Sequence, residues 1–284
     1  MKEVLKAIED YGPKELVITN LFALMGEGVQ VYYNRRRIPL KFNVLVLGKQ
    51  GIGKSYCFLN LAQKLLEFGY FKEKDVQFIH GFYTTKALTT ALVAFPQATY
   101  YVDESYFLLR KRETAEILKQ MLYGDGKIAW MTSREENNIQ PIEFRGNVVF
   151  CANVDYNNNV YRRNADLLAL ADRCFCIVYK PSNKELIEQI EKSYEFDREI
   201  WGKIAKEIAK AREGKVVYIR GRKAEELKRF WKEKFLECYG EEYHPLASLR
   251  SFEKCLQIFA RARLLFKYRY GELAKKLCER VVFR

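Results

Sequence analysis

Residues 43–68 read NVLVLGKQGIGKSYCFLNLAQKLLEF, and this stretch decides the fold. The apolar run at 43–47 predicts a buried strand, and residues 54–68 carry apolar side chains at the i, i+3, i+4 spacing of an amphipathic helix. Between them, GKQGIGKS at 48–55 matches the pattern GxxxxGK[ST] in full. We therefore expect a loop that binds phosphate through its backbone N–H groups and the helix N-terminus.

The residue types of this loop match the chemistry of nucleotide binding. Glycines let the backbone turn its N–H groups toward phosphates, Lys54 is placed to reach the β- and γ-phosphates, and Ser55 to coordinate Mg²⁺. The string alone can arise by chance, but a strand before it and a helix after it favour the functional interpretation. The sequence predicts ATP and Mg²⁺ as cofactors, with nucleotide contacts from Gly48, Lys49, Gln50, Gly51, Ile52, Gly53, Lys54, Ser55 and Tyr56.

Strand and helix patterns alternate through the first part of the chain. After the first strand, four more short apolar runs predict strands at residues 76–79, 98–102, 147–152 and 174–179. Helical patterns are found at residues 54–68, 84–95 and 106–123. This alternation predicts an α/β fold of the P-loop NTPase type, with a doubly wound parallel sheet and helices on both faces.

The pattern changes before the fourth strand and again after the fifth. KIAWMT at 127–132 and IQPIEF at 139–144 flank the polar turn SREENN, which predicts an inserted β-hairpin. From residue 182 onward the periodicity is almost entirely helical. We expect an N-terminal helical and basic connector packed on the core, an α/β nucleotide-binding domain and a helical lid domain, at residues 1–40, 41–181 and 182–284.

An acidic pair, Asp103 and Glu104, ends the third predicted strand in YYVDES. In P-loop folds the strand ends face the phosphate loop. Asp103 is expected to help hold Mg²⁺, and Glu104 to polarise the attacking water as general base. Such a pair can also simply cap the following helix, but the phosphate loop earlier in the chain favours the catalytic interpretation.

Three further polar residues are candidates. Asn153 ends the strand NVVFCA, where it would help position the water, although Asn after a strand is also ordinary turn chemistry. Arg173 stands at the entrance of the fifth strand, where it would face a neighbouring subunit as an arginine finger in trans; the alternative is a surface pair with Asp172. Arg250 is the first residue of a predicted helix late in the chain; the alternative is that it is only a charge on the solvent-exposed face of that helix.

Composition and charge limit the classes of function that the protein can have. The formal net charge of +13 favours a polyanionic partner, nucleic acid above all, although an ion-pair-rich surface is an alternative. Seven cysteines without a CxxC pair indicate reduced thiols and no zinc site. The chain has no apolar run of membrane-spanning length, and MKEVLKAIEDYG lacks a signal peptide's apolar core. We expect a cytoplasmic protein.

In this order, the motifs resemble the ATPase region of the minichromosome maintenance (MCM) helicases, which are AAA+ ATPases. KELVITNLFALMG, RRRIPLKFNVLVLG and GKQGIGKS resemble that family's helix, basic connector and phosphate loop. VDES, the hairpin GKIAWMTSREENNIQPIEF and FCAN follow as they do there. ADRCF occupies the place of the family's Ser-Arg-Phe finger, which puts Arg173 on the finger position. SLRSFEKCLQIFARARL resembles the closing helix whose arginine senses nucleotide, which points to Arg250.

The chain also departs from that family. GFYTTKALTTALVAFPQ is too short for the family's additional inserted hairpin, and no segment corresponds to its DNA-gripping or winged-helix domain. The family's loop typically has Ala where Gly53 stands. The hairpin that is present is also similar to that of viral superfamily 3 helicases. These departures leave the residues for ATPase chemistry intact but remove elements that help to drive DNA.

The resemblance implies a homo-oligomeric ring or helical array that couples ATP hydrolysis to DNA translocation or remodelling, in replication or mobile-element maintenance. Two alternatives stay open: a chaperone-like AAA+ ATPase that remodels a protein, and an adaptor whose ATP binding switches DNA association. The hairpin tip could separate the first two, because DNA-handling members place basic or aromatic residues there. Arg134 beside Glu135 and Glu136 favours neither.

Overall fold

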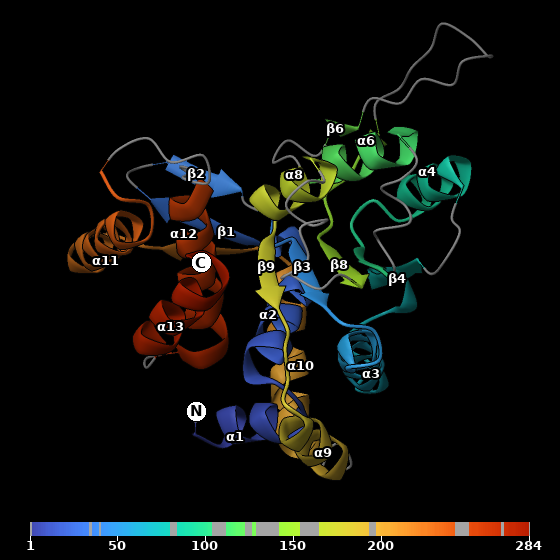
Figure 1. The fold of residues 1–284 in the computed structure, drawn as a ribbon, viewed down its shortest axis with the longest axis horizontal. Coiled ribbons are helices and arrows are strands. Elements are labelled where there is room, and N and C mark those ends of the chain that lie inside the picture. Colours follow the sequence, from blue (N-terminus) through green and yellow to red (C-terminus); the bar gives the residue numbers. More distant parts are fainter. Residues whose placement is uncertain are drawn as a thin grey trace, which may run out of the picture.

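The computed structural model describes residues 2–33, 36–39, 41–79, 84–103, 112–122, 127–128, 142–153, 165–192, 197–241, 250–267 and 270–283. Within these residues the central sheet has five strands in the order β4-β5-β8-β3-β9, and neighbouring strands are parallel (Figure 1). The strands are β3 (Val44–Gly48), β4 (Val76–Ile79), β5 (Thr99–Val102), β8 (Val148–Asn153) and β9 (Phe175–Val178). The mixed α/β fold and all five predicted strands are confirmed.

Helices cover both faces of this sheet, as predicted. Along β3, Val44 and Val46 belong to one hydrophobic core, whereas Leu45 and Leu47 belong to another. A strand buried on both faces needs a continuous apolar run, and NVLVL supplies it. The first core includes α2 (Lys14–Leu24) and α3 (Lys54–Glu67), and the second includes α4 (Thr85–Ala94), α6 (Arg112–Met121) and α8 (Ala165–Arg173).

The inserted hairpin is present at its base. Strands β6 (Lys127–Ile128) and β7 (Ile142–Glu143) pair antiparallel, with Lys127 opposite Glu143 and Ile128 opposite Ile142. This confirms the predicted pairing of the two segments. The turn between them, including Arg134, lies outside the described residues.

A second, three-stranded sheet joins distant parts of the chain and was not predicted. Its order is β10-β1-β2, from β1 (Val29–Tyr33), β2 (Arg36–Pro39) and β10 (Lys215–Tyr218). β1 runs parallel to β10 and antiparallel to β2. The sequence of these regions shows mainly helical periods and a basic cluster. VQVYY has some strand character, but its partner KVVY lies far along the chain, and local periodicity carries no information about such a partner.

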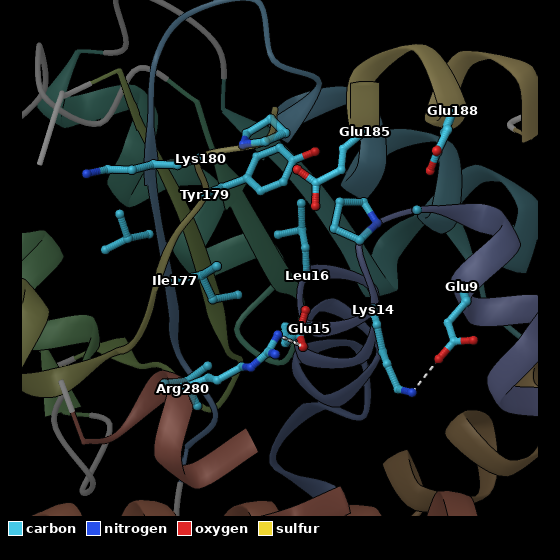
Figure 2. Close-up of a pocket in the computed structure, with 15 residues that line it drawn as sticks. Glu9, Lys14, Glu15, Leu16, Ile177, Tyr179, Lys180, Glu185, Glu188 and Arg280 are labelled. Carbon is cyan, nitrogen blue, oxygen red and sulfur yellow. Dashed lines mark hydrogen bonds and ion pairs between the residues drawn. The ribbon is translucent and has the colours of Figure 1, made fainter. Parts of the chain in front are cut away.

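The remaining helices are α1 (Lys2–Tyr11), α9 (Asn183–Lys192), α10 (Arg198–Arg212), α11 (Arg222–Tyr239), α12 (Arg250–Phe266) and α13 (Gly271–Val281), with short 3₁₀ turns at Gly26–Gly28 and Glu73–Asp75. One continuous hydrophobic core includes residues of α1, α2, β3, α10, α12 and α13. α13 returns to α2, where Arg280 contacts Glu15 (Figure 2). The helical character of both terminal regions is confirmed, while the division into three domains remains a prediction. Among the described residues, no helix is long and apolar enough to cross a membrane.

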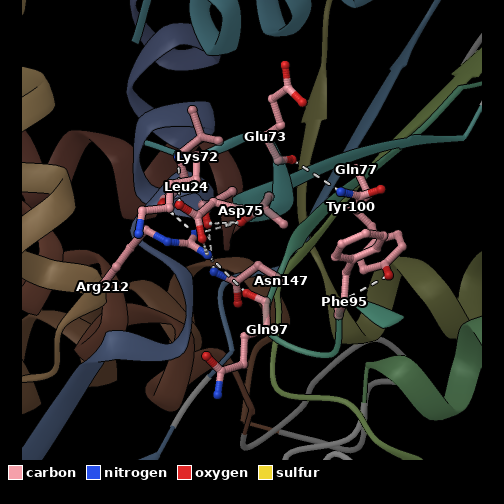
Figure 3. Close-up of polar contacts among 12 residues, drawn as sticks. Leu24, Lys72, Glu73, Asp75, Gln77, Phe95, Gln97, Tyr100, Asn147 and Arg212 are labelled. Atoms are coloured by element: carbon pink, nitrogen blue, oxygen red, sulfur yellow. Dashed lines mark hydrogen bonds and ion pairs between the residues drawn. The ribbon is translucent and has the colours of Figure 1, made fainter. Parts of the chain in front are cut away.

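The carboxyl end of α2 is held by side chains from distant segments. The last carbonyls of a helix lack partners within it, and the helix dipole makes this end partly negative. Arg212 on α10 donates Nη1 to the Leu24 carbonyl at 3.0 Å and Nη2 to the Gln97 carbonyl at 3.0 Å (Figure 3). Asn147 Nδ2 donates to the neighbouring Ala23 carbonyl at 2.8 Å. Arg212 therefore ties the helical region to the α/β core.

Arg261 on α12 makes a second tie to the same helix end. Its side chain is fully buried, with Nε donating to the Phe22 carbonyl at 3.1 Å and Nη2 to the Gly26 carbonyl at 2.9 Å. The guanidinium carbon lies 4.9 Å from the ring centroid of Phe42. Burial lowers the pKa of Arg261 to about 9, so the cation costs free energy that these carbonyls and the ring offset.

Replacing Arg261 with alanine should lower the free energy of unfolding by about 3–5 kcal/mol, because it leaves two buried carbonyls unpaired and opens a cavity. Urea unfolding followed by circular dichroism measures the loss. Arg263 is a matched control two residues along the same helix, since its Nη1 donates to the Tyr218 carbonyl from a partly exposed side chain. Arg263→Ala should cost at most about 1 kcal/mol. If both variants lose the same free energy of unfolding, the buried contacts of Arg261 do not stabilise the fold more than those of an exposed arginine.

Candidate active site

The loop at 49–53 lies between a strand and a helix, as the sequence predicts. β3 ends at Gly48 and α3 begins at Lys54, so the helix N-terminus lies directly after the loop. Gly53 has a φ of 84°, in the left-handed region, where a side chain costs about 1–2 kcal/mol. This is the position at which the MCM family typically has alanine. Gly48 allows a close approach, because a Cβ there would lie 2.6 Å from the Tyr179 carbonyl oxygen.

Lys54 is the most enclosed polar residue of the loop, at 4% exposed. Its Nζ donates to the carbonyls of Gly48 at 3.0 Å and Lys49 at 2.5 Å, and to Asn153 Oδ1 at 2.9 Å. Burial lowers the pKa of this ammonium, an effect that the nearby Cys151 and Asp103 oppose. The structure thus brings together two predicted site residues, Lys54 and Asn153, that are far apart in the chain.

Sheet register explains this meeting. β8 lies beside β3, and Asn153 is the register partner of Gly48, the last residue of β3. Both strands therefore end at the same level, and the side chain that follows the fourth predicted strand reaches the phosphate loop. In open parallel sheets, ligands bind at this carboxyl edge.

A second predicted pair meets next to the first. Ser55 Oγ donates to Asp103 Oδ2 at 2.9 Å, which joins the first turn of α3 to the end of β5. Hydroxyl and carboxylate oxygens are ligands that Mg²⁺ accepts. Glu104, the expected general base, follows Asp103 directly but lies outside the described residues.

The rest of the loop is more open. Lys49 and Gln50 are exposed, Ile52 is half-buried against the core, and Tyr56 is 57% exposed on the first turn of α3. The predicted nucleotide contacts of these residues remain predictions.

A cavity of about 740 Å³ lies at the carboxyl end of β9, the strand next to β3, and no sequence pattern predicted it (Figure 2). Tyr179, one of its lining residues, lies beside the strand that leads into the loop: its backbone N–H donates to the Leu47 carbonyl at 2.8 Å. The lining comes from the α1–α2 junction, the end of β9 and the start of α9, and α13; it includes Pro13, Leu16, Ile177, Tyr179, Lys180, Glu185, Glu188 and Arg280. No local motif could indicate it, because segments from both ends of the chain form it.

The lining of this cavity combines charged and apolar side chains. Leu16, Ile177 and Val281 supply apolar wall, while Glu185 and Glu188 extend from α9. Figure 2 shows two ion pairs among the lining residues: Lys14 with Glu9, and Arg280 with Glu15. A volume of this size is typical of small-molecule sites, while seven of the fifteen lining residues are charged.

Arg173 and Arg250 lie at the opposite edge of the sheet from the phosphate loop. Arg173 ends α8 just before β9, whose first residue, Phe175, is the register partner of Val44 at the start of β3. The five residues of β3 separate the two edges by about 13 Å. The structure therefore does not bring either arginine to the loop of its own chain.

The two arginines are neighbours in one corner. Arg250, at the first position of α12, contacts the Asp172 carboxylate beside Arg173. Lys254 Nζ donates to the Cys174 carbonyl at 2.7 Å, one turn along α12. Arg173 Nη1 donates to the Ala169 carbonyl at 2.7 Å. The Asp172 carboxylate is thus paired with Arg250, from the predicted nucleotide-sensing helix.

No protein-family model matches this sequence, and no curated protein shows significant similarity to it.

Proposed function

We propose that this protein is an ATPase of the AAA+ type, resembling the MCM ATPase region. The observation that carries the proposal is the meeting of Lys54 with Asn153, and of Ser55 with Asp103, at the carboxyl ends of three neighbouring strands. The Lys54 ammonium and the N-terminus of α3 beside a glycine-rich loop can bind phosphates. The carboxylate and hydroxyl oxygens next to them can bind a metal ion. The strand order, with β3 between β8 and β9, supports the same proposal.

In this proposal the hydrogen bonds of Lys54 change on binding. Its Nζ now donates to loop carbonyls and to Asn153, and the phosphates of ATP would replace some of these acceptors. The ammonium that burial disfavours then gains negative partners, which stabilises its charge. Asn153, released from Lys54, is free to orient a water molecule next to the γ-phosphate.

The proposed chemistry is attack of that water on the γ-phosphorus, with the bond to the β–γ bridging oxygen breaking. Glu104 would accept the proton of the water. Ser55 and Asp103 fit Mg²⁺ as oxygen ligands, and a bound magnesium ion would neutralise part of the phosphate charge. The protein's own contribution is to position these groups and to bind charge that develops on the phosphoryl oxygens.

The cavity beside the loop would hold the nucleoside. It begins where Tyr179 contacts the strand that leads into the loop, so a phosphate chain on the loop would direct its base and ribose into this volume. Leu16 and Ile177 offer apolar surface to a base, and carboxylates such as Glu185 can accept hydrogen bonds from ribose hydroxyls or an exocyclic amine.

We further propose that hydrolysis occurs between subunits of a homo-oligomer and is coupled to DNA. Arg173 lies at the sheet edge opposite its own phosphate loop, which suits a finger for a neighbour's γ-phosphate. The net charge of +13 and the hairpin of β6 and β7 support a nucleic-acid partner. Measuring ATP turnover with and without single- and double-stranded DNA tests the coupling; a rate that neither DNA changes favours the protein-remodelling alternative.

Glu104→Gln tests the chemistry itself. This variant should bind ATP normally and hydrolyse it about 10²–10⁴-fold more slowly, because the amide keeps the shape but cannot accept the proton. Phosphate release and the affinity for a fluorescent ATP analogue measure the two properties separately. Glu113, an exposed carboxylate on the first turn of α6, is the control, and Glu113→Gln should behave as wild type. A loss of affinity in Glu104→Gln, without loss of turnover at saturating ATP, contradicts the role of general base.

A further inference from the structure

The small sheet β10-β1-β2 has one covered and one exposed face. Val29, Val31 and Val217 are buried in the hydrophobic core that includes α12. The side chains between them alternate to the other face, as the pleat of a strand requires. There Tyr32 and Tyr218 are register partners, and their ring centroids lie 5.1 Å apart.

This outer face exposes aromatic and apolar surface. The Tyr218 side chain is 48% exposed and that of Val216 is 39% exposed. The guanidinium carbon of Arg220 lies 5.6 Å from the centroid of the Tyr218 ring. Tyr32, Tyr218 and Arg220 therefore form a row of three planar groups on the surface of the sheet.

Two arginines, Arg37 and Arg220, supply positive charge on this face. Arg37, the register partner of Tyr32 on β2, is exposed, and its Nε donates to Gln30 Oε1. In the segment 213–223 only Arg220 is placed with Tyr218: Lys215 is the register partner of buried Val29, Arg222 pairs with Glu226, and Lys223 lies over the Tyr270 ring. An exposed aromatic row among cations complements a polyanion that also presents flat rings.

The edge of this sheet is less suited to a partner than its face. Arg263 Nη1 on α12 donates to the Tyr218 carbonyl at 2.8 Å. Because β10 is the outermost strand on this side, that hydrogen bond occupies an acceptor which an added strand would otherwise use. The geometry favours a ligand that lies across the face over a peptide strand that extends the sheet.

We propose that the outer face of β10-β1-β2 binds single-stranded nucleic acid. Bases stack on the rings of Tyr218 and Tyr32 and on the Arg220 guanidinium, while phosphates contact Arg37 and Arg220. This inference rests on the nucleic-acid part of the proposed function and assigns it a surface separate from the inserted hairpin. It does not depend on ATP hydrolysis.

Fluorescence anisotropy with labelled oligo(dT) and oligo(U), at low salt and without nucleotide, tests the surface. Tyr218→Ala should weaken binding about 5- to 150-fold, the range of one lost stacking contact, whereas Tyr218→Phe should bind as wild type because the ring remains. Arg220→Ala should reduce the slope of log affinity against log salt by about 0.7. Comparing the two oligonucleotides distinguishes DNA from RNA as the natural ligand.

Tyr70 provides a matched control, because it is 45% exposed and has Arg198, Lys203 and Lys206 nearby, but lies after α3, outside this sheet. Tyr70→Ala should bind as wild type, and all variants should keep basal ATP turnover and the wild-type melting temperature. If wild type binds oligonucleotide and Tyr218→Ala binds equally well, or Tyr70→Ala loses as much, the surface assignment is wrong while a nucleic-acid partner stands. If wild type binds neither oligonucleotide, both the surface and the nucleic-acid partner fail, and only the ATPase remains.

Discussion

Arg173→Ala should bind ATP almost as wild type and hydrolyse it about 10³–10⁵-fold more slowly, the range found when an arginine finger is removed. The reason is its position: Arg173 ends α8 at the amino edge of the sheet, about 13 Å from the loop of its own chain along β3. In the proposed oligomer it would act on the next subunit's γ-phosphate and leave its own nucleotide untouched. Steady-state turnover and the affinity for a fluorescent ATP analogue separate the two effects.

A mixing experiment distinguishes action in trans from a local defect. Arg173→Ala and Lys54→Ala subunits together should recover part of the activity, at interfaces that pair an intact phosphate loop with an intact finger. A mixture that is no more active than its parents, with subunit exchange verified, contradicts action in trans.

Local structure needs its own control, because Arg173 Nη1 also donates to the Ala169 carbonyl within α8. Arg173→Lys keeps the positive charge, and Arg229→Ala removes an exposed arginine from α11. Equal melting temperatures for Arg173→Ala, Arg173→Lys and wild type would exclude a folding defect. Arg229→Ala should hydrolyse ATP as wild type, which shows that loss of a surface arginine alone does not reduce turnover.

Lys54→Ala should abolish nucleotide binding, with a loss of at least about 2–5 kcal/mol in the free energy of binding, as expected when one partner of a buried charge pair is truncated. Lys54 is 4% exposed, and its ammonium donates to the Gly48 and Lys49 carbonyls and to Asn153. No other amine in the described part of the chain makes these contacts. Isothermal titration with ATP and Mg²⁺ measures the loss.

Lys64 is the matched control for Lys54. It lies on the same helix, pairs with Glu67 and is 34% exposed, so Lys64→Ala should bind ATP as wild type. Lys54→Ala should also keep its fold, because burial lowers the pKa of this ammonium and so disfavours its charged form in the free protein. An Lys54→Ala protein that is well folded and still binds ATP tightly would overturn the proposed nucleotide site.

The sequence by itself determined the parts of the site that are local. The apolar run at 43–47 requires a strand buried on both faces, and the period after it requires an amphipathic helix. Gly53 ends the loop between these two elements and Lys54 begins the helix, so the residues that surround them along the chain follow from the sequence alone. The ends of the other strands were also predictable, because each apolar run is bounded by polar residues such as Asp103 and Asn153.

Only the tertiary structure decided which of these local pieces meet. Periodicity reports how a segment is buried but not which segment covers it, since any apolar strand can pair with any other. Because β8 lies beside β3, Asn153 contacts Lys54. Because α13 packs near α2, both helices line the cavity together with Tyr179. The pairing of β1 with β10, and the burial of Arg261 at the end of α2, depend on contacts between residues far apart in the chain. Such contacts form because the whole core packs at once, and no short stretch of sequence specifies them.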